Sequence, residues 1–117
     1  MHELGIVFEV LKRVKEVVEI NHIEPEDVAA VVLEIGEAST VVPKFMEECW
    51  PAAIDQTPYN HVELKIEIEK AQVECKSCHR VYEYLSNNKA CPDCGHIYAT
   101  IVTGDQFNLK EILLYEQ

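Results

Sequence analysis

Two Cys-x-x-Cys pairs constrain the fold of this chain more than any other feature. Cys75 and Cys78 form the first pair, Cys91 and Cys94 form the second, and twelve residues separate them. Each pair brings two thiolates to one ion from a tight turn, so the two turns supply a closed tetrahedral shell for Zn²⁺, with Zn–S bonds of about 2.3 Å. Because a closed shell has no position for a substrate, we expect this metal to stabilise the fold and not to catalyse a reaction.

Two other interpretations of the four cysteines have to be weighed. Two disulfides would suit a secreted protein, but charged residues at Glu3 and Glu9 and the lack of an apolar core before a cleavage site predict no secretory signal. Iron in a rubredoxin-like site uses the same four sulfurs, and the sequence leaves this alternative open.

The overall composition narrows the class of partner. The chain has 117 residues, of which 48% are hydrophobic and 26% charged, and its net charge is −11. Such an acidic chain lacks the basic face that a nucleic-acid-binding protein needs. No apolar stretch is long enough to span a bilayer, and free thiols beside a metal motif predict a cytoplasmic protein. The fifth cysteine, Cys49, is expected to be a small buried apolar residue.

Hydrophobic periodicity predicts two helices and three main strands. Residues 4–21 read as an amphipathic helix, and residues 43–55 as a second helix that starts at Pro43 and buries Trp50. Pro51 is expected to kink or shorten this second helix. Strands are predicted at 27–35, 62–69 and 108–115, with two short strands, 81–84 and 97–102, around the cysteines. In the first strand, Val31, Leu33 and Ile35 are expected to alternate with Val32 and Glu34. The apolar positions expected on the first helix are Leu4, Val7, Phe8, Leu11, Val14 and Val18.

This order of elements predicts the fold class. We expect an α+β protein, in which a small domain of two helices and a three-stranded sheet carries an inserted four-cysteine, zinc-ribbon-like lobe. Residues 1–72 and 105–117 would form the α/β domain, and residues 73–104 the metal lobe.

The first three residues form a second candidate metal site. In Met1-His2-Glu3, a free α-amine, an imidazole and the amide nitrogen between them can close adjoining chelate rings on one cation. Nitrogen donors in a plane suit Ni²⁺ or Cu²⁺ in square-planar geometry. Spacing alone makes this a weak signal, because an accidental histidine at position two explains it equally well.

Three motifs in this order resemble the HypA/HybF family of hydrogenase nickel-insertion proteins. They are Met1-His2-Glu3-Leu4, then Leu33-Glu34-Ile35-Gly36-Glu37, then the two cysteine pairs, and the resemblance covers essentially the full length. It implies a nickel-binding α/β domain with an inserted zinc lobe. The family delivers Ni²⁺ to the large subunit of [NiFe]-hydrogenase, works with the GTPase HypB, and in some organisms also serves urease maturation.

The resemblance also implies roles for individual residues. His2 would bind nickel through its ring and backbone nitrogen, while the Met1 amine and the Glu3 backbone would complete the donor set. The four cysteines would hold zinc. Val42 stands where some relatives carry an acidic residue, so a carboxylate ligand from that position is not available here.

Two histidines next to the cysteines call for a separate expectation. His79 follows Cys78 directly, and His96 follows Cys94 by two residues. The simpler hypothesis is that both are exposed, since four sulfurs already complete the shell. The alternative is that one of them replaces a cysteine ligand when pH or nickel loading changes. His22 and His61 are expected to be solvated loop residues.

These observations together predict a cytoplasmic nickel metallochaperone and not an enzyme. No nucleophile–base arrangement and no phosphate-binding glycine loop is recognisable. Its cofactors would be structural Zn²⁺ and transferable Ni²⁺, and its partners a HypB-type GTPase, the [NiFe]-hydrogenase large subunit and urease maturation proteins. A zinc-ribbon interaction module and a rubredoxin-like electron carrier are the alternative functions.

Overall fold

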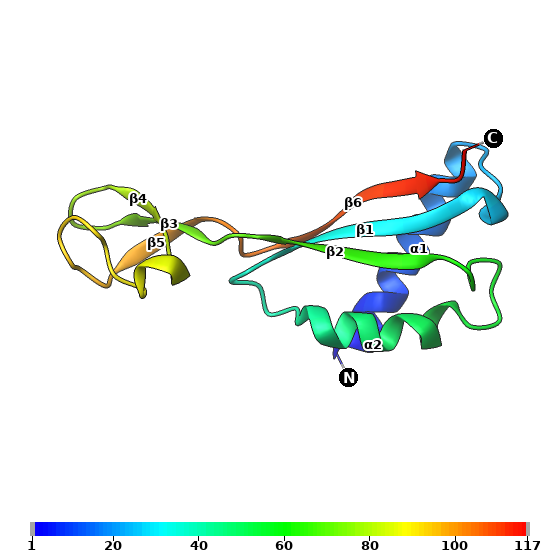
Figure 1. Ribbon diagram of the computed structural model, residues 1–117, viewed down its shortest axis with the longest axis horizontal. Helices are drawn as coiled ribbons and strands as arrows, with labels where there is room; N and C mark the ends of the chain where they lie inside the picture. Colours follow the sequence, from blue (N-terminus) through cyan, green and yellow to red (C-terminus); the bar gives the residue numbers. More distant parts are fainter. Residues whose placement is uncertain (1, 117) are drawn as a thin grey trace. The chain divides into compact units, whose positions relative to one another are not determined.

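The structure is a computed structural model that describes residues 2–116, without the side chains of His2 and Glu3. Ten helical or strand elements follow one another along this part of the chain (Figure 1). Their bounds are α1 His2–Ile20, η1 Pro25–Asp27, β1 Val28–Gly36, α2 Pro43–Ile54, β2 Glu63–Glu69, β3 Gln72–Cys75, β4 Val81–Glu83, η2 Leu85–Asn87, β5 Ala99–Thr103 and β6 Phe107–Leu114.

The chain divides into two compact units. Unit 1 comprises residues 1–34, 41–67 and 108–117, and unit 2 comprises residues 35–40 and 68–107. The strands form two three-stranded sheets, with the orders β2-β1-β6 and β4-β3-β5. The expected α+β fold with two helices, a three-stranded sheet and a lobe that carries the four cysteines is therefore confirmed. None of the helices in the described part has the length and apolar character that crossing a membrane requires.

The core of unit 1 comes from α1, α2 and β1. Val7, Leu11, Val14 and Val18 of α1 are buried, as the helical period predicts. Phe8, expected on the same face, is 47% exposed, whereas Val10, which was not expected there, is buried. The apolar stripe therefore lies to one side of the position that the sequence pattern alone indicated.

The C-terminus of α1 is fixed by a local backbone motif. The N–H of Ile23 donates to the carbonyl of Val18, and the N–H of His22 donates to that of Glu19, which is the hydrogen-bond pattern of a Schellman motif. His22 supplies the left-handed residue, with φ of 56°. The Asn21 side chain donates to the Val17 carbonyl at 2.8 Å, in agreement with the predicted stop.

α2 continues through its proline. The helix runs from Pro43 to Ile54, so Pro51 does not end it. The N–H of Asp55 donates to the Pro51 carbonyl and closes the last turn. The buried Trp50 side chain donates from Nε1 to the Val62 carbonyl at 2.8 Å, which ties the helix to the start of β2. The contact of α2 with the start of β2 thus outweighs the loss of the helical hydrogen bond that Pro51 cannot donate.

β1 is the central strand of its sheet. In Figure 1, β1 and β2 run in the same direction, connected by α2, and β6 runs back along the other edge of β1. The sequence predicted an alternating strand, but Val28, Ala30 and Val32 are buried as well as Val31, Leu33 and Ile35. Both faces of β1 are therefore largely removed from solvent, and a strand buried in this way reads as a nearly continuous apolar run.

Three backbone segments approach one another closely at the start of unit 2. A Cβ on Gly36 would lie 2.2 Å from the Gly104 carbonyl oxygen, and a Cβ on Gly104 would lie 2.6 Å from the Ala71 Cα. Gly104 also has φ of 91°, a conformation that suits glycine. The Ile35-Gly36-Glu37 motif therefore has a physical reason, since only a residue without a side chain fits at its centre.

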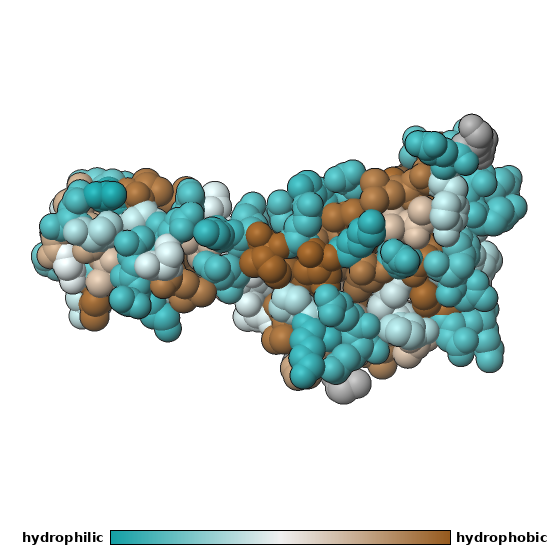
Figure 2. All heavy atoms as spheres, viewed as in Figure 1, coloured by the Kyte–Doolittle hydropathy of each residue, from teal (hydrophilic) through white to brown (hydrophobic). Residues whose placement is uncertain are grey.

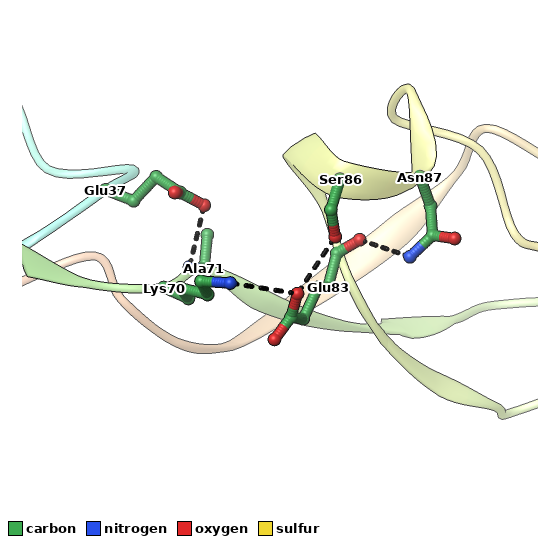
Figure 3. A network of polar contacts seen from close by, with 6 residues as sticks. All are labelled: Glu37, Lys70, Ala71, Glu83, Ser86 and Asn87. Carbon is green, nitrogen blue, oxygen red and sulfur yellow. Dashed lines mark hydrogen bonds and ion pairs between the residues drawn. The ribbon is translucent and has the colours of Figure 1, made fainter.

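A network of polar contacts continues from this point into the sheet of unit 2 (Figure 3). Glu37 Oε1 accepts a hydrogen bond from the Ala71 N–H at 3.1 Å. Lys70 Nζ lies 3.6 Å from Glu83 Oε2, which also accepts from the Ser86 hydroxyl at 2.9 Å. The network connects the loop after β1 with the segment between β2 and β3 and with the η2 turn.

Candidate metal centre

Two chain segments with the same backbone conformation carry the four cysteines. In the first, the N–H of Cys75 donates to the Arg80 carbonyl, and the N–H of His79 donates to the Cys75 carbonyl. In the second, the N–H of Cys91 donates to the His96 carbonyl, and the N–H of Gly95 donates to the Cys91 carbonyl, all at 2.9 Å. We call the two segments, residues 75–80 and 91–96, the knuckles.

The equivalence of the knuckles extends to a left-handed residue in each. The residue after the second cysteine has a left-handed conformation in both, with φ of 64° at His79 and 76° at Gly95. Glycine adopts this conformation without a steric penalty, whereas a histidine does not. Gly95 therefore suits its tight turn, whereas His79 occupies the same turn position at a cost.

The four sulfurs meet at one point. One ligand atom from each of Cys75, Cys78, Cys91 and Cys94 lies within 4.8 Å of the others. The sulfurs of Cys75 and Cys94 are 3.5 Å apart, as are those of Cys78 and Cys91. A tetrahedron with Zn–S bonds of about 2.3 Å has edges of about 3.8 Å, so a four-sulfur shell fits this arrangement after small movements.

Backbone amides lower the net pKa at two of the four sulfurs. The Cys78 N–H, assisted by that of Ser77, donates to the Cys75 sulfur and lowers the pKa of Cys75 to about 6, against the opposing effect of burial. Burial also opposes ionisation of Cys91, but the amides of Cys94 and Asp93 outweigh it and lower its pKa.

At the other two sulfurs the net effect raises the pKa. The Arg80 amide favours the thiolate of Cys78, but the hydrogen bond shared with the Cys91 sulfur and burial outweigh it, and the pKa of Cys78 rises to about 12. The pKa of Cys94 is raised in the same way, despite the amide of His96. Four thiolates this close repel one another, so a divalent cation is what allows all of them to ionise, with release of protons.

Burial of the site is uneven. Cys75 and Cys91 are buried in a small cluster with Val73 and Tyr82, whereas Cys78 and Cys94 are exposed. The Tyr82 hydroxyl is buried and has no hydrogen-bond partner among residues 2–116. Burial, and then the nearby Cys75 and Cys91 thiolates, raise the pKa of this tyrosine.

The two histidines next to the cysteines differ in their surroundings. His96 Nδ1 lies 3.2 Å from the Cys94 sulfur, within hydrogen-bond distance of a ligand atom. His79 Nδ1 instead lies 3.7 Å from Glu74 Oε1. Both side chains are exposed, as the simpler hypothesis expected, and the exchange of a histidine onto the metal stays a prediction.

One contact between the knuckles was not expected from the sequence. The Arg80 guanidinium donates to the Asp93 carboxylate, and so joins the end of the first knuckle to the middle of the second. Both side chains are about half exposed, so the pair adds little stability by itself. No signal in the sequence identifies it, because Arg80 and Asp93 become neighbours only when the four sulfurs converge.

The N-terminal candidate site lies outside the described part of the chain. This holds for Met1 and for the side chains of His2 and Glu3. The backbone of α1, in contrast, is described from His2 onward.

Four further residues named from the sequence lie in unit 1. Trp50 is buried as expected, but Cys49 is only partly buried. His22 is exposed. His61 lies in a turn and is exposed as expected, and in addition its Nε2 lies 3.0 Å from the Val28 carbonyl oxygen and its ring stacks on Tyr115 at a centroid distance of 6.4 Å.

Comparisons with known proteins agree over nearly the whole length. Residues 1–114 match the profile of a family described as HypA, hydrogenase/urease nickel incorporation, metallochaperone. A hydrogenase maturation factor HypA from Geobacter sulfurreducens is 34% identical over 112 residues, which are 96% of this chain and 97% of the relative. The corresponding protein from Aquifex aeolicus is 32% identical over 114 residues, 97% of each chain.

Solved structures show the same fold. The solution structure of the Ni metallochaperone HypA from Helicobacter pylori superposes with a TM-score of 0.65 and 20% identity, over 98% of both chains. A second solution structure, described as HypA protein, gives a TM-score of 0.68 and 22% identity, over 98% of this chain and 97% of the other.

Proposed function

Because the chain belongs to the HypA family of hydrogenase/urease nickel-incorporation metallochaperones, we propose that it binds Ni²⁺ at its N-terminus and delivers the ion for [NiFe]-hydrogenase maturation. The observation that carries the proposal is the extent of the family match, which starts at residue 1 and so includes Met1-His2-Glu3. In this proposal, the Met1 amine and the ring and backbone nitrogen of His2 bind the ion, and the Glu3 backbone completes the donor set.

The start of α1 supports the use of backbone donors. The helix begins at His2, and the first four N–H groups of an α-helix have no carbonyl acceptor within the helix. A cation that binds the amide nitrogens of His2 and Glu3 therefore breaks no helical hydrogen bond. Planar nitrogen coordination of this kind suits Ni²⁺.

The electrostatics of this end of the helix suit a cargo that must be released. The helix macrodipole places partial positive charge at the N-terminus, which disfavours a bound cation by about 0.3–1 kcal/mol. The acidic charge of the chain acts in the opposite direction and attracts cations over a longer range. The result is a site of moderate affinity, from which the ligands of an acceptor can take the ion.

The four-cysteine centre has a structural role in this proposal. Its sulfurs would hold Zn²⁺ in a complete shell, so the ion has no open position for a substrate and supplies folding energy. Residues 73–104 would thus form the zinc lobe, and residues 1–72 with 105–117 the nickel-binding domain. A chaperone of this kind is not an enzyme.

The proposed partners in nickel delivery follow from the family. We assign to this chain a HypB-type GTPase and the [NiFe]-hydrogenase large subunit as partners, with urease maturation proteins as a further client route, in the cytoplasm. The family description includes both hydrogenase and urease incorporation, which supports this range.

Calorimetric titration of the untagged chain with Ni²⁺ tests the N-terminal site. His2→Ala is expected to abolish binding of one equivalent of nickel, because it removes the imidazole donor. The matched control is His22→Asn, which removes an exposed imidazole of the same unit at a left-handed position that asparagine tolerates. This control should bind nickel like the unaltered protein.

Two further measurements make the outcome unambiguous. Zinc content should be the same in all three proteins, because the cysteines are untouched. Unchanged nickel affinity and unchanged hydrogenase maturation in His2→Ala would show that the proposed site is wrong.

A further inference from the structure

One buried polar group of unit 2 has no role in the contacts described so far. The Tyr82 hydroxyl is shielded from solvent and has no hydrogen-bond partner within residues 2–116, and only 5% of the whole residue is exposed. An unpaired buried hydroxyl destabilises a fold, whereas a phenylalanine ring would fill the same space without this cost. Packing therefore explains the ring of Tyr82 but not its oxygen.

The position of Tyr82 places it beside a cysteine of the metal centre. In the antiparallel pairing of β3 with β4, Tyr82 lies opposite Val73. Cys75 follows Val73 by two residues on β3, so it lies on the same face of the sheet and is a diagonal neighbour of Tyr82. An aromatic side chain can reach a diagonal neighbour. Tyr82 accordingly packs in one cluster with Val73, Cys75 and Cys91.

The two buried sulfurs have few sources of hydrogen bonds. Figure 2 shows many hydrophilic residues on the surface of unit 2, and the exposed Cys78 and Cys94 face this polar environment and water. Cys75 and Cys91 are buried and depend on donors from the chain. For Cys75 these are the backbone amides of Cys78 and Ser77.

A loaded metal centre increases the need for donors on the buried side. Four thiolates around one divalent cation leave an excess of two negative charges. Hydrogen bonds to a charged acceptor are stronger than those between neutral groups, and a low local dielectric strengthens them further. The phenol of Tyr82 keeps its proton at neutral pH, because burial and the neighbouring thiolates raise its pKa above the usual value of 10.0. It can therefore act as a donor to a thiolate.

We propose that the Tyr82 hydroxyl donates a hydrogen bond to the Cys75 sulfur of the metal-loaded centre. This inference rests on the four-thiolate shell of the proposed function. The Cys75 and Cys94 sulfurs are 3.5 Å apart, and a zinc shell has edges of about 3.8 Å, so binding of the ion moves the sulfurs. A hydroxyl hydrogen rotates to suit its acceptor, so it can follow this movement.

Tyr82 is thus a positioning residue, because it contacts a ligand of the ion and not the ion itself. Groups that hydrogen-bond to a metal ligand fix its orientation and tune its electron density. Since the Tyr82 hydroxyl gains its acceptor in the loaded centre, the hydrogen bond adds to the affinity for zinc. It also connects the ion to β4, a strand that contributes no cysteine.

Zinc affinity of the untagged protein, measured by competition with a chromogenic chelator, gives the size of the effect. Tyr82→Phe should raise the dissociation constant for zinc about 10-fold, which is typical when a ligand loses its hydrogen-bond partner. The matched control is Tyr98→Phe, which removes a hydroxyl from a tyrosine of the same unit that is 70% exposed. This control should bind zinc like the unaltered protein.

The absorption spectrum of the Co²⁺-substituted protein distinguishes a hydrogen bond from a packing effect. A donor withdraws electron density from the thiolate and so raises the energy of the sulfur-to-cobalt charge-transfer band. Tyr82→Phe should therefore shift this band to longer wavelength, whereas Tyr98→Phe should not. The donors proposed at the N-terminus are nitrogens, so the band reports on the cysteines.

The band shift is the deciding result. An unshifted band in Tyr82→Phe would overturn the proposal whatever the zinc affinity, and would leave the four-thiolate shell intact. If the unaltered protein gave no sulfur-to-cobalt band at all, the shell itself would be wrong and the hydrogen bond with it.

Discussion

Unit 1 and unit 2 are stabilised by different means. Unit 1 buries a core of valine, leucine, isoleucine and methionine side chains from two helices and a central strand. Unit 2 buries few side chains, and two of them are cysteines of the metal centre; they are Ile35, Ala71, Val73, Cys75, Tyr82 and Cys91. A short segment that cannot bury enough apolar surface needs another source of free energy, which a metal ion bound by the four cysteines would supply.

This difference predicts that metal removal affects one unit and not the other. A strong chelator should unfold unit 2, because coordination of zinc by four thiolates contributes on the order of 10 kcal/mol. Trp50, the single tryptophan, lies in unit 1, so its fluorescence should remain that of the folded protein. Amide exchange measured by NMR would follow both units at once. Simultaneous loss of structure in both would contradict the comparison.

The reverse experiment weakens the core of unit 1. Leu33 is fully buried in β1, so Leu33→Ala should lower the free energy of unfolding of unit 1 by about 3 kcal/mol through a lost side chain and a cavity. Denaturant titration with Trp50 fluorescence measures this loss, and zinc content should not change. Leu114→Ala, at a leucine that is 46% exposed, is the control and should cost much less.

The third largest effect is expected where the backbone packs closely in unit 2. Gly36→Ala should destabilise the protein by about 2 kcal/mol, because its Cβ would lie 2.2 Å from the backbone of Gly104, which cannot move away cheaply. Gly5→Ala is the matched control, since nothing lies within 4 Å of its Cβ and alanine favours a helix. Thermal unfolding should give opposite signs for the two variants. A neutral Gly36→Ala would show that this packing is looser than described.

The smallest expected effect compares the two knuckles with each other. His79→Gly should stabilise unit 2 by about 1 kcal/mol, because glycine relieves the left-handed conformation at φ of 64°. Gly95→Ala, at the equivalent position, should destabilise it by a similar amount. Competition with a chromogenic chelator measures zinc retention in both. Equal retention would mean that the turn conformation does not limit metal binding.

Local sequence was sufficient for much of this molecule. The helical period identified α1 to within two residues at its start and one at its end, and Pro43 marked the start of α2. Errors arose where a side chain's surroundings depend on distant segments. Phe8 was expected to be buried but is exposed. β1 was expected to alternate but is buried on both faces, and its two neighbouring strands are far away in the sequence.

What the sequence determined by itself is the four-cysteine site, because two Cys-x-x-Cys turns carry their own geometry and need only to meet. The tertiary structure decided the rest. It brings Gly36, Gly104 and Ala71 so close together that a Cβ on either glycine would overlap a neighbouring backbone. It also places Arg80 next to Asp93 and leaves β5 at an uncharged edge of its sheet. These features depend on contacts between residues far apart in the chain, and no local pattern of residues encodes such contacts.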